Sequence, residues 1–180
     1  MPPTEPFWPR VSPHFLACRR AVRLHTDAAR PHTDAAHPAI IGLSGGPDSL
    51  ALVAAAAAEG CHVRAVVVDH GLQEGTASVA EQARAKAEKL GVPATIARVE
   101  VETAPGESVE AAAREARYQA LFAEAAADGS DVWVAHTLDD QAETLLLGAL
   151  RGNPAGMPAV TETAGGRLVR PFLQIRRADT

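Results

Sequence analysis

Cysteine is scarce in this sequence, and so are long apolar runs. The two cysteines, Cys18 and Cys61, lie far apart, so they form neither a disulfide framework nor the CxxC pair of a metal or redox site. We therefore expect a protein of a reducing compartment, the cytoplasm. The longest apolar run, residues 50–58, is far below the roughly 20 residues that span a bilayer, and the proline-rich start lacks the apolar core of a signal peptide. No membrane partner is expected.

Basic residues are outnumbered, and aromatic side chains make up only 4% of the chain. The formal net charge of -5 argues against a domain that simply coats nucleic acid, because such domains are usually strongly basic. The charge is unevenly placed, however: residues 1–40 carry +2, residues 41–150 carry -10 and residues 151–180 carry +3. The body is acidic and the ends are basic, and the carboxyl end offers five arginines to phosphates: Arg151, Arg167, Arg170, Arg176 and Arg177.

The length of 180 residues and an apolar fraction of 47% suit one globular domain. Residues 1–38 are rich in proline and contain the segment HTDAA twice, at 25–29 and 32–36. A short helix is expected from His14 to about Leu24. We interpret residues 1–38 as an arm and spacer, with a solvated spacer favoured over a histidine metal site, and residues 39–180 as the catalytic domain.

From Ala39 onward, apolar strand patterns alternate with helical ones. Strands are expected at 39–43, 62–68, 94–101 and 131–135, and helices at 48–59, 76–90, 107–127 and 138–150. A hairpin is expected between residues 159–161 and 167–170. This order predicts an α/β fold with a parallel sheet between two helical layers, a three-layer α/β/α arrangement. Ligands of such folds bind at the carboxyl ends of the strands.

Two common phosphate-binding motifs, GxxxxGK[ST] and GxGxxG, are missing, which excludes the kinase-type loop and the dinucleotide fingerprint. A different turn follows the first strand: Ser44, Gly45, Gly46, Pro47, Asp48 and Ser49. Its glycines let backbone N–H groups approach an anion, its serines add hydroxyl donors, and the following helix points its positive end at the ligand. A phosphate-binding turn is favoured over a glycine turn that merely joins strand to helix.

A second polar group follows the fourth strand, in the segment that begins at His136. Asp139 and Asp140 lie four and three residues before Glu143, and both spacings place carboxylates on one helix face. Solvated acids that cap the helix are the simpler alternative. Acids beside a triphosphate would repel it unless a cation intervened, so magnesium coordination or substrate orientation is favoured.

The turn at 44–49 resembles the SGGxDS signature of the PP-loop ATP pyrophosphatases, a Rossmann-like group of the adenine nucleotide alpha hydrolase type. Together with the HxxDDQAET pattern at 136–144, it closely resembles the tRNA(Ile)-lysidine synthetases. The resemblance implies ATP and Mg²⁺ as cofactors. The implied nucleotide site comprises residues 44–49 with Asp69, His70 and His136, and the implied metal ligands are Asp48, Asp139 and Asp140.

Shorter segments agree with this resemblance in order and spacing. They are DHGL at 69–72, the RxxRY pattern of Arg114, Arg117 and Tyr118, the GM pair at 156–157, and RPFL at 170–173. Each has a plainer alternative. Asp69 and His70 could cap the turn after a strand, and Arg114 could pair with Glu110 on an exposed helix.

The resemblance implies a ligase that works in two steps on the wobble cytidine of tRNA(Ile). ATP adenylates the C2 oxygen and pyrophosphate leaves; the amine of free L-lysine then attacks C2 and AMP leaves. The implied catalytic residues are Asp48, Arg114, Asp140 and Glu143, and the implied contacts to substrate or tRNA are Arg114, Arg117, Tyr118, Glu143 and Arg170. The alternatives are another PP-loop enzyme, which thiolates tRNA or forms an amide, and a non-catalytic ATP-binding module.

Members of the family that this chain resembles continue into a helical second domain beyond their RPLL segment, which RPFL at 170–173 matches. Here the sequence stops shortly after it, at Asp179 and Thr180, two residues suited to begin a helix. We therefore expect an amino-terminal catalytic fragment without the family's tRNA-binding domains. A homodimer is compatible with this expectation.

Overall fold

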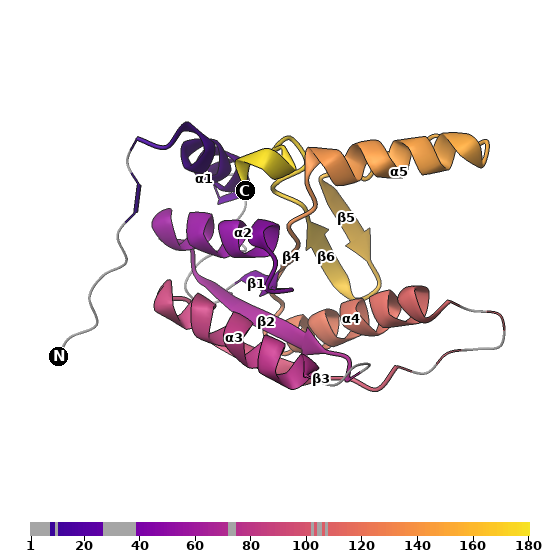
Figure 1. Cartoon of the computed structure of the whole chain (residues 1–180), viewed down its shortest axis with the longest axis horizontal. Coiled ribbons are helices and arrows are strands. Elements are labelled where there is room, and N and C mark those ends of the chain that lie inside the picture. Colours follow the sequence, from indigo (N-terminus) through magenta and orange to yellow (C-terminus); the bar gives the residue numbers. More distant parts are fainter. Residues whose placement is uncertain are drawn as a thin grey trace.

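A six-stranded sheet organises the chain, with its strands in the order β3-β2-β1-β4-β6-β5 (Figure 1). The computed structural model describes residues 8–9, 11–26, 39–71, 75–101, 103, 106 and 108–180. The strands are β1 Ala39–Gly42, β2 Val63–Asp69, β3 Ala94–Arg98, β4 Val132–Trp133, β5 Val160–Thr163 and β6 Gly166–Val169. The helices are α1 Pro13–Thr26, α2 Pro47–Ala58, α3 Thr76–Lys89, α4 Val109–Ala126 and α5 Leu138–Leu150, followed by a 3-10 turn, η1 Arg177–Asp179.

The strand order confirms the α/β prediction and adds an antiparallel edge. Strands β3, β2, β1, β4 and β6 pair in parallel. Strand β5 pairs antiparallel with β6, because the two are joined by a tight turn and strands so joined must run in opposite directions. The hairpin expected from the sequence therefore forms, and it extends the main sheet.

Helices cover both faces of the sheet and bury two apolar clusters. On one face, α1, α2 and α3 pack over a cluster that includes Ile41, Leu52 and Phe172. On the other, α4 packs Leu121 against Ile40 and Val132. Alternate residues of β1 thus enter opposite clusters, as expected for a strand buried on both sides.

Helix α1 belongs to this packed unit, although its sequence suggested an arm. Cys18 and Val22 are one helical turn apart, and both are buried in the larger cluster against α2. Figure 1 shows α1 lying beside α2. The packed unit therefore begins before Ala39. Most of the duplicated HTDAA segment lies outside the described residues.

Strand β4 is shorter than the expected residues 131–135. Only Val132 and Trp133 have strand geometry, although the N–H of Val134 still donates to the Val169 carbonyl at 3.0 Å. The chain then leaves the sheet, and Val134, Ala135 and His136 line a cavity where neighbouring strands end. Strand β3 also ends early, at Arg98.

Helix α5 forms as expected, but it buries no residue. It projects from the edge of the sheet (Figure 1), and Leu146 and Leu150 are 68% and 84% exposed. Along the described part of the chain, no helix combines the length and apolar character needed to cross a membrane.

Replacing Phe172 by alanine is expected to lower the free energy of unfolding by about 3–5 kcal/mol, because its ring is fully buried and its loss leaves a cavity. Urea denaturation measures this change. The matched control is Leu150→Ala, which removes an exposed apolar side chain and should change stability by no more than about 0.5 kcal/mol. Equal effects of the two substitutions would contradict the described core.

Candidate functional site

The two polar turns expected from the sequence meet at the centre of the sheet. Strand β1 pairs in parallel with β4, while the chain continues from β1 to β2 on the opposite side. This is the point where the strand order reverses, and α/β folds bind ligands there, beyond the carboxyl ends of the strands. A cavity of about 300 Å³ lies at this place, lined among others by Ser44, Asp48, His136 and Asp140.

The turn after β1 leaves the start of helix α2 open. Gly45 has a φ of 83°, a conformation that favours glycine, and a Cβ there would lie 3.1 Å from that of Ala83. Ser44 Oγ lies 3.1 Å from Ser49 Oγ, and Ser49 donates to the Gly46 carbonyl. The N-cap residue of α2, Gly46, has no side chain and forms no capping hydrogen bond, so N–H groups of the first turn have no partner from their capping residue, an arrangement suited to an anion.

The turn after β4 is organised by a capping box at the start of α5. The hydroxyl of Thr137, which is fully buried, accepts the Asp140 N–H, and Asp140 Oδ2 accepts the Thr137 N–H at 2.6 Å. Burial raises the pKa of Asp140, but the hydrogen bonds from Thr137 and the charge of Arg177 outweigh it and hold that pKa below its usual value. Asp140 is therefore a fixed carboxylate.

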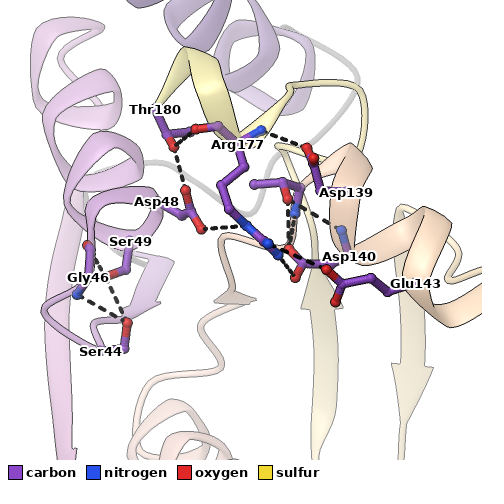
Figure 2. A network of polar contacts seen from close by, with 10 residues as sticks. Ser44, Gly46, Asp48, Ser49, Asp139, Asp140, Glu143, Arg177 and Thr180 are labelled. Carbon is purple, nitrogen blue, oxygen red and sulfur yellow. Dashed lines mark hydrogen bonds and ion pairs between the residues drawn. The ribbon is translucent and has the colours of Figure 1, made fainter.

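Arg177 joins the two turns, as Figure 2 shows. Its guanidinium lies 2.7 Å from Asp140 Oδ1, 3.4 Å from Glu143 Oε1 and 3.9 Å from Asp48 Oδ2. Its backbone N–H donates to Asp139 Oδ2 at 2.7 Å. The acids predicted as one functional group are thus gathered around an arginine, which the sequence had offered only as a contact for phosphates.

The three predicted metal ligands do not form a metal-binding group by themselves. Within the described ranges, no cluster of three or more histidine, cysteine, aspartate or glutamate side chains is close enough to hold an ion. Asp139 is held by the backbone of Arg177. Magnesium usually takes one or two carboxylates and completes its shell with phosphate and water oxygens. Asp48 and Asp140, which both line the cavity, suit that arrangement.

Two histidines face the cavity with a ring nitrogen that has no partner among the described residues: His70 Nδ1 and His136 Nδ1. Burial, followed by the charge of Arg114, lowers the pKa of His136 to about 4. Burial and the charge of Arg117 lower the pKa of His70 as well. Both rings are neutral at pH 7 and can exchange hydrogen bonds with a neutral part of a ligand.

The three residues of the RxxRY pattern lie together on α4. Arg114 and Arg117 lie 5.2 and 5.5 Å from the centre of the Tyr118 ring, within the range of a cation–π interaction. Arg114 also reaches the Tyr118 hydroxyl at 3.3 Å. Of the residues described here, Arg114 contacts Tyr118 and not Glu110, so the plainer surface-pair alternative is wrong. Arg117 lines the cavity, and its Nε has no partner in the described chain.

Asp69 and Arg170 serve the structure around the site. The Thr76 hydroxyl and the Gly71 N–H hold the pKa of Asp69 below its usual value, which matches the turn-capping alternative. Arg170 is only 8% exposed, and its Nη1 donates to the Pro158 carbonyl and to Thr161, both at 2.8 Å. It braces the hairpin from inside the protein. Its Nε has no partner among the described residues, and the predicted contact to substrate or tRNA stays a prediction.

Sequence reasoning missed two further residues of the site region. Thr180 donates its hydroxyl to Asp48, and Gln141 brackets the backbone of Met157, accepting its N–H at 2.6 Å and donating to its carbonyl at 2.8 Å. The second contact explains the GM pair, because a Cβ on Gly156 would lie 3.1 Å from the Gln141 amide. The only sequence signal for Gln141 was its place in the HxxDDQAET pattern at 136–144.

Comparisons with known proteins agree with this geometry. A PP-loop domain is recognised over residues 19–180. The chain is 52% identical over 172 residues to the tRNA(Ile)-lysidine synthase of Corynebacterium glutamicum, covering 96% of this chain and 50% of that protein. It is 53% identical over 149 residues to the enzyme of that name from Nocardia farcinica, covering 79% and 44%. The chain spans about half the length of these relatives.

Solved structures share the fold at low sequence identity. The U34-tRNA thiolase NcsA of Methanococcus maripaludis superposes with a TM-score of 0.74 at 16% identity, over 92% of this chain and 60% of the other. The NMN synthetase of Francisella tularensis gives 0.60 at 14% identity, over 92% and 67%. The three-layer arrangement predicted from the sequence is thereby confirmed.

The lowered pKa of His136 predicts a loss of stability on the acidic side. The unfolded chain binds a proton at this residue below about pH 6.5, whereas the folded protein does so only near pH 4. The free energy of unfolding should therefore decrease as the pH falls from 6.5 towards 4. Urea titrations at pH 7 and pH 5 should show a smaller decrease for His136→Gln, and an NMR titration of His136 centred near 6.5 would contradict the described burial.

Proposed function

The chain belongs to the PP-loop family, and from that premise we propose that it carries the catalytic site of a tRNA(Ile)-lysidine synthase. In the proposed reaction, ATP activates the C2 oxygen of the wobble cytidine in tRNA(Ile), and the amine of L-lysine replaces it. One observation carries the proposal: an open phosphate-type turn and a fixed carboxylate group face one another across a single cavity. We place the reaction in the cytoplasm; the homodimer stays a prediction.

The turn at 44–49 would hold the part of ATP that leaves. N–H groups at the start of α2 and the hydroxyl of Ser44 present donors to the β- and γ-phosphates, which stabilises charge as the bond to the α-phosphorus breaks. Ser49, whose own proton goes to the Gly46 carbonyl, would help to position the Ser44 hydroxyl, 3.1 Å away. Bound Mg²⁺ would supply further neutralisation of the phosphates, held by Asp48 and Asp140. The C2 oxygen attacks the α-phosphorus, and pyrophosphate carries away the electron pair.

Asp140 and Glu143 would handle the lysine amine in the second step. Asp140 is held by the capping box and has a lowered pKa, so it suits binding an ammonium group better than removing a proton. Glu143 is 62% exposed in its side chain and lies one turn along α5, where it can accept the proton that the amine loses on attacking C2. AMP then leaves from C2.

The RNA would approach over α4. Arg114, Arg117 and Tyr118 form a charged and aromatic group that suits a phosphate and a stacked base. Neutral His136 and His70 lie deeper, where they can bind the edge of a nucleobase without adding charge. Arg170 supports this region from the hairpin and lowers the pKa of His136.

The proposed function predicts that pyrophosphate forms only when tRNA(Ile) with a CAU anticodon is present, and that AMP forms only when L-lysine is present as well. Radiolabelled ATP measures the release, and mass spectrometry of the digested tRNA detects lysidine. The control tRNA carries a different wobble base. Equal release without tRNA contradicts the proposal, and ATP binding without any cleavage in the complete mixture favours the non-catalytic ATP-binding module.

Removing one hydroxyl from the phosphate turn should weaken ATP binding. Ser44 is exposed to the cavity, so Ser44→Ala leaves the core intact and is expected to raise the ATP dissociation constant by about tenfold, the value of a hydrogen bond to a charged group. Isothermal titration with Mg²⁺ present measures it. The control, Ser78→Ala, removes an exposed serine on α3 and should leave binding unchanged; equal losses would remove the phosphate assignment.

A further inference from the structure

Arg177 lies at a place where its charge affects both walls of the cavity. It comes from η1, and its guanidinium contacts Asp48 on α2 as well as Asp140 and Glu143 on α5. Figure 2 shows the side chain passing between these helices. Arg177 itself does not line the cavity, whereas Asp48 and Asp140 do. The arginine therefore stands behind two of the carboxylates that any ligand in the cavity would meet.

These carboxylates create an electrostatic problem for a polyphosphate. A triphosphate held at the turn 44–49 brings several negative charges to within a few ångströms of Asp48 and Asp140. Charges at that distance interact strongly where solvent is partly excluded. The repulsion must be offset by a cation, and Arg177 supplies one that belongs to the chain.

The backbone around Arg177 is held in place before any ligand arrives. Its N–H donates to Asp139, and Thr180 donates to Asp48. Asp179 accepts from His14 of α1 at 2.5 Å, and the Ile175 carbonyl accepts the Leu138 N–H at 2.8 Å. Contacts to three helices thus fix the segment that carries the guanidinium, which lowers the entropic cost of keeping it at the acids.

We propose that Arg177 is the built-in counter-ion of the phosphate site: it neutralises Asp48 and Asp140 so that a nucleoside triphosphate can bind there even without a divalent cation. This inference rests on the proposed ATP site and adds a residue to it. A bound divalent cation performs the same neutralisation, so the arginine matters most when that cation is absent.

The neighbouring Arg176 provides a matched control. Its side chain is exposed and, in the described part of the chain, makes no hydrogen bond or ion pair. Arg176→Ala and Arg177→Ala remove the same charge from adjacent positions. Any difference between them therefore reports the contacts of Arg177 and not the net charge of the protein.

The experiment compares ATP dissociation constants in EDTA and in excess Mg²⁺, by isothermal titration, for the unmodified protein, Arg177→Ala, Arg177→Lys and Arg176→Ala. In EDTA, Arg177→Ala should bind ATP at least about tenfold more weakly than the unmodified protein, because the carboxylates are then uncompensated. In Mg²⁺ the difference should shrink to about threefold or less. Arg177→Lys should retain most of the binding in EDTA, and Arg176→Ala should resemble the unmodified protein.

The outcomes separate this inference from the proposed function. Loss of ATP binding by the same factor in EDTA and in Mg²⁺ would mark Arg177 as merely structural, and equal behaviour of Arg177→Ala and Arg176→Ala would also overturn the inference. If the unmodified protein binds no ATP under either condition, the proposed function itself fails. Thermal melting of each variant identifies any that has lost its fold. If Arg177→Ala does not fold, the inference is tested on Arg177→Lys, which keeps the charge and must retain most of the ATP binding in EDTA.

Discussion

The site depends on the parallel pairing of β1 with β4. Ile40 and Ile41 lie opposite Val132 and Trp133, and this register brings the carboxyl ends of the two strands to the same edge. The phosphate-type turn and the acidic turn each follow one of these strands directly, so they must meet although about 90 residues separate them in the chain. The polar side chains of the site are therefore positioned by the backbone hydrogen bonds of the sheet and by the apolar clusters on its two faces.

Charge is the second constraint, and the structure balances it locally. The chain has a net charge of -5, yet the acids beside the cavity are gathered around Arg177. The positive charges of Arg114 and Arg170 also act near the cavity, where they lower the pKa of His136. A site that brings carboxylates and arginines together in this way can hold an anion and a cation close together. The net charge of the chain therefore says little about its ligands.

Most of the fold could be predicted from the sequence, because alternating strand and helix patterns are local and each ends at clear turn residues. Helix α5 and the two turns were expected at their observed places. The packing of α1 was missed, although Cys18 and Val22 already had the spacing of a buried helix face. The hairpin formed by β5 and β6 was predicted. Its position in the main sheet was not, because it depends on the pairing of β6 with β4, two strands that lie far apart in the sequence.

The site was predicted less completely. The motif residues were found because glycines, hydroxyls and acids cluster in the sequence. The role of Arg177 was not, because it follows the acids by more than 30 residues and nothing local distinguishes it from Arg176. Only the tertiary structure shows which arginine contacts the acids. The burial of Arg170 likewise depends on the hairpin that it braces.

The two oxygens of the Asp140 carboxylate have different partners. One of its oxygens closes the capping box with Thr137, and the other contacts Arg177 at the cavity. The same carboxylate thus starts a helix and, in the proposed enzyme, would serve the ligand site. Replacing this side chain would therefore disturb both the start of α5 and the proposed chemistry. Glu143, one turn further, is largely exposed and takes no part in the capping box, so a change there would leave the start of the helix intact.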